Sequence, residues 1–341
     1  MLLGLLACLS TAGSWATAQP GAAHGLMGTD GDRPTEQAVD AVPVAAKWAQ
    51  ALQSFDAGQL NVHSVLVMQA GQLVVERYRA GQDRGIYSLW SSCQRFGPDD
   101  LHDMRSVSKS VIGLLYGILL ERHQVPGLET PVASLYPDEP ELDRPPRNQI
   151  RIRHLLTMSA GLDWDEPSPV HRSQQDDQIA LLWARAFYPA VFDRDVVAAP
   201  GERFVYSGGL TAVLVDVMER STGRGLLELV ESELFRPLGI VDWTWSRDLR
   251  GRPLAHAGLR LRPRDLLKLG ELVLNQGRWD GRPLVPAAWI EAASSTQVQA
   301  SEAYGYGYLW WTRAHGVGGA VRQVAQAIGN GGQRIYVVPA L

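Results

Sequence analysis

Residues 104–110, Met-Arg-Ser-Val-Ser-Lys-Ser, open a long apolar run that continues to Leu120. Ser106 and Lys109 are three residues apart, so on a helix their side chains share one face, one turn apart. A serine hydroxyl is a weak nucleophile and becomes reactive when a neighbouring group can take its proton. Burial and the positive end of a helix both disfavour the ammonium form of a lysine. The stretch therefore predicts a helix that starts near Ser106 and presents a reactive serine–lysine pair.

The lysine content adds weight to this motif, because Ser-x-x-Lys alone is common. The chain has three lysines, Lys47, Lys109 and Lys268, among 32 Lys+Arg residues, and only Lys109 has a serine three positions before it. Because a guanidinium stays protonated, a lysine at 109 indicates a role that arginine cannot fill. The alternative is a surface serine and lysine at the start of a helix.

Composition places the chain among ordinary globular proteins. Its 341 residues are 45% hydrophobic and 20% charged, enough for one large domain or two lobes. The formal net charge of −4, with no basic stripe, gives no support for nucleic-acid binding. The eight histidines are scattered and form no His-Glu-x-x-His motif, so the sequence predicts no metal site.

The N-terminal residues read as a targeting segment. Residues 2–9 are apolar, and Ala16-Thr17-Ala18 resembles a cleavage site, so we expect a signal peptide over 1–18 and a flexible leader over 19–43. Cys8 follows a Leu-Leu-Ala sequence, which leaves a lipoprotein anchor as the alternative. No later apolar run approaches the roughly 18 residues of a membrane span. An exported protein, periplasmic or secreted, is the expectation.

Apolar spacing predicts strands at the two ends of the chain and helices in the middle. We expect two neighbouring strands of a central sheet over 62–68 and 73–78, a loop over 81–100, and late strands over 304–311 and 334–338. Helices are expected over 44–55, 106–122, 150–158, 179–187, 210–220, 225–234 and 263–275. Gly113 and Gly117 would let another backbone approach the helix over 106–122. The pattern predicts an α/β lobe (44–115 and 250–341) with an inserted helical lobe (116–249).

Two later stretches carry further candidate residues. Residues 200–209 make a Pro-Gly turn and an extended piece that leads to Tyr206, with Ser207 as the predicted cap of the next helix. Residues 329–333, Gly-Asn-Gly-Gly-Gln, form a turn directly before the last strand. Residues 164–166, Trp-Asp-Glu, are predicted to be a solvated loop and are not assigned to the site.

The order of these features resembles a known group of enzymes. A Ser-x-x-Lys pair, then a loop tyrosine, then a glycine-rich approach to a late strand is similar to the serine β-lactamase and penicillin-recognising superfamily. The resemblance is to the branch of class C β-lactamases, DD-peptidases, related esterases and 6-aminohexanoate-oligomer hydrolases. Residues 101–106, 152–162, 258–266 and 306–311 are also similar to that group. The resemblance implies a β-lactamase/transpeptidase-like α/β (α+β) fold, with an antiparallel central sheet flanked by helices and an inserted all-helical lobe.

The resemblance also implies roles for individual residues. Ser106 would attack a carbonyl and form an acyl-enzyme, Lys109 would hold the proton balance, and Tyr206 would be the general base. The backbone amides of Ser106 and Gln333 would form the oxyanion hole, and water would then hydrolyse the ester without a metal or cofactor. The substrate would be a small-molecule ester, amide or peptide-like compound.

Three departures from that family affect the expectation. Gly208 stands where the Tyr-x-Asn motif has asparagine, and Asn330-Gly331-Gly332 stands where a Lys-Thr-Gly or His-x-Gly motif would supply a cation. We therefore expect ester or amide hydrolysis rather than β-lactamase activity. The sequence ends directly after the last predicted strand, where the family continues, so a C-terminally truncated domain is a further expectation.

Two other functions stay open. One is a non-catalytic envelope protein that binds a ligand on the same fold, or an enzyme inactivated by truncation. The other is a DD-peptidase or β-lactamase. An α/β-hydrolase is disfavoured, because no serine has glycine both two positions before it and two positions after it.

Overall fold

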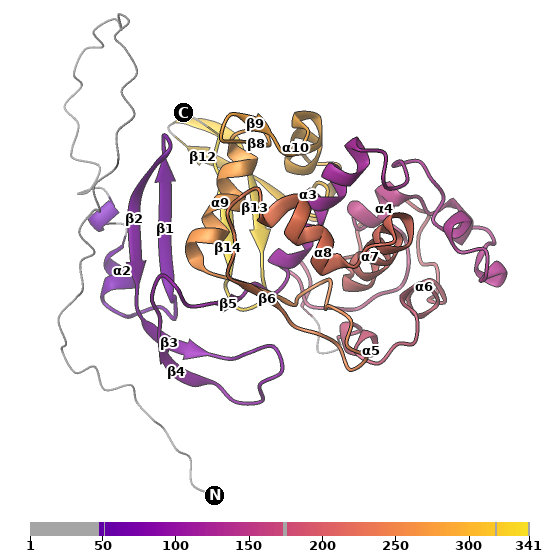
Figure 1. Ribbon diagram of the computed structural model, residues 1–341, viewed down its shortest axis with the longest axis horizontal. Helices are drawn as coiled ribbons and strands as arrows, with labels where there is room; N and C mark the ends of the chain where they lie inside the picture. The colour runs from indigo at the N-terminus through magenta and orange to yellow at the C-terminus, as the bar shows by residue number, and fades with distance from the viewer. Residues whose placement is uncertain (1–47, 51, 173–175, 318, 340–341) are drawn as a thin grey trace, which may run out of the picture.

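The computed structural model describes residues 48–50, 52–172, 176–317 and 319–339 (Figure 1). The predicted signal peptide, the leader, Cys8 and the start of the helix expected over 44–55 lie outside these residues and stay predictions. Of that expected helix, residues 48–50 are helical in the described chain, and a short helix, α2, follows at Gln53–Asp56.

Most strands lie in the first and last parts of the chain, and most helices lie between them. The helices are α2 (Gln53–Asp56), α3 (Val107–Glu121), α4 (Ile152–Leu156), α5 (Gln178–Leu181), α6 (Phe187–Phe192), α7 (Gly208–Thr222), α8 (Leu226–Val230), α9 (Pro263–Leu274) and α10 (Ala287–Ser294), with a π-helical turn, η4 (Glu231–Phe235), after α8. The strands are β1 (Ser64–Gln69), β2 (Gln72–Tyr78), β3 (Ala80–Asp83), β4 (Ser92–Arg95), β5 (His102–Asp103), β6 (Trp243–Trp245), β7 (Leu259–Leu261), β8 (Arg278–Trp279), β9 (Arg282–Pro283), β10 (Val298–Gln299), β11 (Gly305–Tyr306), β12 (Trp311–Val317), β13 (Ala320–Ile328) and β14 (Arg334–Val337).

The largest sheet is antiparallel, as predicted, and has five strands in the order β10-β11-β12-β13-β14. The long β12–β13 hairpin forms its middle, with Trp311 opposite Gln326 and Val317 opposite Ala320. Helices α9 and α10 pack against this sheet, α9 on β14 and α10 on β13. Helices α4, α6 and α7 gather on the other side of α3 from the sheet (Figure 1). The fold is therefore mixed α/β, with a helical group beside an antiparallel sheet.

Helix α3 is the central element. Every residue from Val107 to Leu119 is buried, and the helix contacts β13, α7, α8 and α10. A helix that is apolar on all sides is expected to be buried on all sides. A Cβ on Gly113 would lie 2.8 Å from the Tyr308 carbonyl oxygen, so this glycine lets a backbone approach, as predicted. A Cβ on Gly117 would lie 2.3 Å from the Trp289 ring, so here the close neighbour is a side chain.

The first hairpin differs from its predicted place. β1 and β2 pair with each other and form a separate two-stranded sheet, not neighbouring strands of the five-stranded one. Helix α9 contacts both β1 and β14. The alternating apolar residues of this hairpin predicted the strands correctly, but they carry no information about which further strand each would pair with.

The strand predicted over 304–311 is wrong, because the chain turns within it. β11 ends at Tyr306, and β12 starts only at Trp311. A Cβ on Gly307 would lie 2.1 Å from the Ala293 carbonyl oxygen, and Leu309 has a φ of 61°. The aromatic alternation in this stretch thus reflects packing around a turn, with Tyr306, Trp310 and Trp311 in the core.

Other local predictions have mixed outcomes. The helix expected over 179–187 is two short helices, α5 and α6, and the loop expected over 81–100 contains the hairpin β3–β4. Helices α3, α7 and α9 confirm the ranges expected for them within two residues. The Ser207 hydroxyl accepts a hydrogen bond from the Leu210 N–H at 3.2 Å, which confirms the predicted cap of α7.

Candidate active site

Ser106 is held at the junction between β5 and α3. β5 pairs with β7, and the Met104 N–H donates to the Leu259 carbonyl at 2.8 Å. Arg105 has a φ of 50°, in the left-handed region that a long side chain rarely adopts. Its guanidinium donates to the Arg84 carbonyl at 2.7 Å and lies 3.6 Å from Asp103. Strained backbone next to a reactive residue persists only where its surroundings hold it, and these contacts hold Arg105.

Lys109 points from the first turn of α3 toward Ser106. Its Nζ lies 3.1 Å from the Ser106 Oγ and 3.3 Å from the His256 carbonyl oxygen. The same Nζ lies 4.6 Å from the centre of the Tyr206 ring. Lys109 is 1% exposed, so it is a buried amine and not a surface lysine at a helix start. The structure thus brings together the three residues that the sequence proposed as catalytic.

Tyr206 reaches this place from the segment before α7. The Val205 N–H donates to the Met158 carbonyl at 2.8 Å, which fixes the chain just before the tyrosine. The Tyr206 ring packs against Trp311 at 5.4 Å and, edge to face, against Tyr306 at 6.2 Å. Aromatic packing of this kind orients a ring by its edges and faces. Residues of the helical group and of the five-stranded sheet therefore meet at Tyr206.

Glu166 belongs to the same cluster, although the sequence placed it in a solvated loop. The residue is 1% exposed, and its Oε1 lies 3.5 Å from the Lys109 Nζ. Its Oε2 accepts hydrogen bonds from the Gly208 N–H at 2.6 Å and from the Trp164 indole N–H at 2.7 Å. The polar residues around Glu166 predicted a solvent-exposed loop. The one signal in the sequence was the glycine at 208, which leaves space that the Glu166 carboxylate fills.

The charges in this cluster influence one another strongly. Burial alone would lower the pKa of Lys109, but the Tyr206 phenol and the Glu166 carboxyl outweigh it, and the pKa is raised. Burial raises the pKa of Glu166, opposed by the Lys109 charge and the Gly208 N–H. Burial and then the Lys109 charge lower the pKa of His256 to about 3, so its imidazole is neutral at physiological pH.

The turn between β13 and β14 lies against the start of the nucleophile segment. A Cβ on Gly329 would be 2.6 Å from the Met104 carbonyl oxygen. Gly331 and Gly332 have φ values of 132° and 101°, so the backbone of this turn itself requires glycine. Gln333 follows them and is half-buried.

Polar groups of this turn differ in exposure. Asn330 is exposed, and the Gln333 Oε1 is buried without a hydrogen-bond partner among the described residues. The sequence indicated no cation here, but Arg334 brings one. Its NH1 donates to the Gly329 and Gln333 carbonyls at 2.7 and 2.8 Å. The guanidinium is thus used to hold the turn.

A cleft of about 380 Å³ opens beside Tyr206 and Glu166. This volume is within the range of small-molecule sites. Its remaining lining comes from three parts of the chain and mixes apolar with polar side chains: Trp164, Ser168, Val170 and His171; Glu202, Arg203, Phe204 and Val205; and Gln299 and Ala300. Neither Ser106 nor Lys109 lines the cleft, which reaches the pair only through Glu166 and Tyr206, the two lining residues that contact Lys109.

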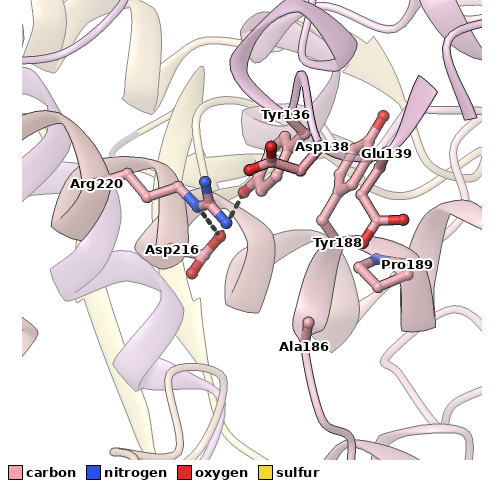
Figure 2. Close-up of a pocket in the computed structure, with 8 residues that line it drawn as sticks. All are labelled: Tyr136, Asp138, Glu139, Ala186, Tyr188, Pro189, Asp216 and Arg220. Atoms are coloured by element: carbon pink, nitrogen blue, oxygen red, sulfur yellow. Dashed lines mark hydrogen bonds and ion pairs between the residues drawn. The ribbon is translucent and has the colours of Figure 1, made fainter.

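A second, smaller cavity of about 60 Å³ lies in the helical part of the molecule (Figure 2). Figure 2 shows Asp216 bonded to both Tyr136 and Arg220 along one side of it. The Tyr136 and Tyr188 rings stack at 3.8 Å. None of the predicted site residues lines this cavity. Asp216 pairs with Tyr136 and Arg220, whereas the buried Tyr188 hydroxyl has no hydrogen-bond partner among the described residues, and we assign the cavity no function.

A half-buried serine beside a buried lysine at the start of a central helix, next to a sheet, defines the β-lactamase-related class of serine hydrolases. The chain belongs to the Beta-lactamase family, whose model matches residues 48–340. It is 26% identical over 292 residues to the 6-aminohexanoate-dimer hydrolase of Paenarthrobacter ureafaciens, covering 80% of this chain and 69% of that protein. It is 31% identical over 151 residues to the lovastatin esterase of Penicillium rubens, covering 41% of this chain and 35% of the esterase.

A solved structure supports the fold. The octameric penicillin-binding protein homologue from Pyrococcus abyssi superposes with a TM-score of 0.63 at 20% identity, over 86% of this chain and 70% of that one. The predicted family and fold are thereby confirmed, and the two named relatives are a hydrolase and an esterase. In the described part of the chain, no helix combines the length and hydropathy needed to cross a membrane.

Proposed function

We propose that the protein hydrolyses ester or amide bonds of a small or peptide-like substrate through an acyl-enzyme on Ser106. The observation that carries the proposal is the contact of 3.1 Å between Ser106 Oγ and the buried Lys109 Nζ, with the Tyr206 ring beside them. A hydroxyl and a buried amine at this distance, with a tyrosine that lines the cleft beside them, form the arrangement that nucleophilic catalysis requires.

In the proposed acylation, the Ser106 Oγ forms a bond to the substrate carbonyl carbon. The Tyr206 oxygen, as a phenolate beside the Lys109 ammonium, takes the serine proton. The bond from the carbonyl carbon to the leaving oxygen or nitrogen then breaks, and the leaving group receives that proton. In deacylation, water attacks the ester, gives a proton to Tyr206, and Ser106 leaves with a proton returned to its oxygen. The net reaction consumes one water and releases an acid and an alcohol or amine.

The negative charge of the tetrahedral intermediate needs donors placed in advance. We propose the backbone N–H groups of Ser106 and Gln333 for this role. The support is the position of the β13–β14 turn, whose Gly329 lies against the Met104 carbonyl. Asn330 and Gly332 stay as proposed substrate-side residues. Gly208 was expected beside them, but its N–H donates to the Glu166 Oε2, so we propose that it acts on the site through Glu166.

We propose a substrate with an uncharged group near the scissile bond, in a cleft that Glu202 and Arg203 line together with apolar side chains. Trp164, Val170, Phe204 and Ala300 give it apolar walls. The Arg334 guanidinium is bound to two backbone carbonyls, which leaves it poorly placed to meet a substrate carboxylate. We therefore propose simple esters and amides as better substrates than β-lactams or D-Ala-D-Ala peptides.

A labelling experiment tests the proposal. We expect a fluorophosphonate probe to add to the wild-type protein, and p-nitrophenyl butyrate to be hydrolysed, whereas Ser106→Ala does neither. A chromogenic cephalosporin should be turned over far more slowly than the ester. Folded wild-type protein that neither labels nor hydrolyses any ester or amide would contradict the proposal and favour the ligand-binding alternative.

A further inference from the structure

A side chain at position 208 would be crowded by three neighbouring side chains. A Cβ there would lie 3.0 Å from the Gln178 Cγ, 3.1 Å from the Glu166 Oε2 and 3.1 Å from the His256 Cγ. All three distances are tighter than ordinary van der Waals contact. A larger residue at the second position after Tyr206 would therefore require Gln178, Glu166 or His256 to shift, because their side chains already occupy the space beside it.

The group that fills this space is a carboxylate with two different oxygens. Glu166 Oε2 is anchored by the Gly208 and Trp164 N–H groups at 2.6 and 2.7 Å. Glu166 Oε1 is buried and has no hydrogen bond in the described chain, but it faces the Lys109 Nζ at 3.5 Å. One oxygen thus fixes the carboxylate, and the other is directed at the catalytic amine.

We propose that Glu166 is a positioning residue that holds Lys109 as an ammonium ion aimed at Ser106, replacing a polar side chain at position 208. The inference rests on the proposed function and deepens it. A buried ammonium without a counter-charge is unfavourable, and Glu166 supplies that charge. An ammonium can donate to the Ser106 oxygen but cannot take its proton. The acceptor of the serine proton is then the Tyr206 oxygen and not Lys109.

Four titratable groups surround Lys109, and they differ in what they contribute. Tyr206 and Glu166 act on it most strongly among its neighbours. The His256 imidazole is neutral at physiological pH and offers its carbonyl instead. Burial raises the pKa of the Asp176 carboxyl, and hydrogen bonds from Gln178 and the Lys109 charge oppose this rise. Among the described residues, the ion pair of Lys109 is with Glu166, so removal of this one carboxylate should change the titration of the amine.

The test is Glu166→Gln, which keeps the shape and can still accept both N–H groups. We expect kcat for p-nitrophenyl butyrate to fall by about 10²-fold with little change in KM, because the amine is no longer held in place. The alkaline limb of the kcat/KM profile should move to lower pH, because Lys109 loses an interaction that favours its charged form. An unchanged kcat and pH profile in an enzyme whose wild type labels at Ser106 would overturn the inference.

Two comparisons separate positioning from a merely structural role. Glu219→Gln changes a half-buried carboxyl outside the site that accepts the Leu226 N–H at 2.7 Å, a bond that glutamine can keep, so it should move neither kcat nor the pH profile. Gly208→Asn should lose activity by collision, whereas Glu166→Ala combined with Gly208→Asn should recover part of the activity lost by Glu166→Ala alone. A Gly208→Asn protein as active as wild type, or no recovery in the double variant, would contradict the replacement. Failure of wild-type protein to label would instead reject the proposed function itself.

Discussion

At the scale of single residues, the site depends on side chains that combine burial with charge. Lys109 and Glu166 are each 1% exposed and face each other, while Ser106 sits one turn away at the helix start. Arg105 adopts a left-handed φ directly before the nucleophile. These features are costly in a protein that only needs to fold, so their presence together favours chemistry over packing.

Tyr206→Phe tests the base at this scale. The phenyl ring keeps the packing on Trp311 and Tyr306 and stays below the Lys109 ammonium, while the oxygen that would carry the proton is lost. We expect kcat for an ester to fall by about 10²–10⁴-fold, the usual contribution of a general base. KM and the melting temperature should change little. Steady-state kinetics measures kcat and KM, and thermal denaturation measures the melting temperature. A kcat close to that of wild type would assign the proton transfer to another group.

The sequence identified some site residues and missed others for a physical reason. Ser106 and Lys109 were found because helical spacing places them on one face, and Tyr206 because of its order in the chain. Glu166 was missed because Asp165 and the polar residues after it indicate a solvent-exposed loop. Its carboxylate is buried against Gly208, whose N–H donates to it. Gly208 is distant in sequence and comes beside Glu166 only through the packing of α7.

At the scale of elements, long apolar helices could be predicted and polar hairpins could not. α3, α7 and α9 have apolar runs with clear ends. By contrast, β3 reads Ala-Gly-Gln-Asp and has no β-branched residue, and β13 intersperses its two valines and one isoleucine with alanine and glutamine, so the composition that predicts strands is absent from β3 and diluted in β13. Their strand conformation is set by pairing with a neighbour, which a local pattern does not specify.

Gly117→Ala tests the packing of α3. Alanine favours a helix by about 1 kcal/mol over glycine, but here its Cβ would lie 2.3 Å from the Trp289 ring. Overpacking of a dense core costs about 1–3 kcal/mol. Because the Trp289 indole also donates to the Gly113 carbonyl at 2.9 Å, the ring cannot move away freely. We expect net destabilisation, measured as a lower melting temperature.

The matched change is Glu121→Ala, at the exposed last position of the same helix. It should leave the melting temperature unchanged or slightly raised, since no neighbour is crowded. If Gly117→Ala stabilised the protein as much as Glu121→Ala, the close packing of Trp289 on α3 would be refuted.

At the scale of the whole molecule, the site lies where distant parts of the chain meet. The nucleophile comes from the start of α3, the tyrosine from the segment before α7, and the far wall of the cleft from residues 299–300 after α10. Because α3 contacts both the sheet and the helical group, it fixes the position of one relative to the other. The cleft can therefore vary in shape through its walls while the serine–lysine pair stays in place.

Ala300→Phe tests whether this cleft receives the acyl group. Ala300 is half-buried and lines the wall formed by the sheet side of the molecule. A phenyl ring there would take up part of the volume of about 380 Å³. We expect kcat/KM for p-nitrophenyl hexanoate to fall by at least about 10-fold, since one or two methylenes in an apolar site already change discrimination by that amount. The acetate ester, whose acyl group ends before the wall, should keep its rate.

Ala320→Phe adds the same ring at an exposed position of the β12–β13 hairpin and should alter neither rate. Equal losses for acetate and hexanoate in Ala300→Phe would mean that residue 300 supports the site as a whole and that the acyl chain lies elsewhere.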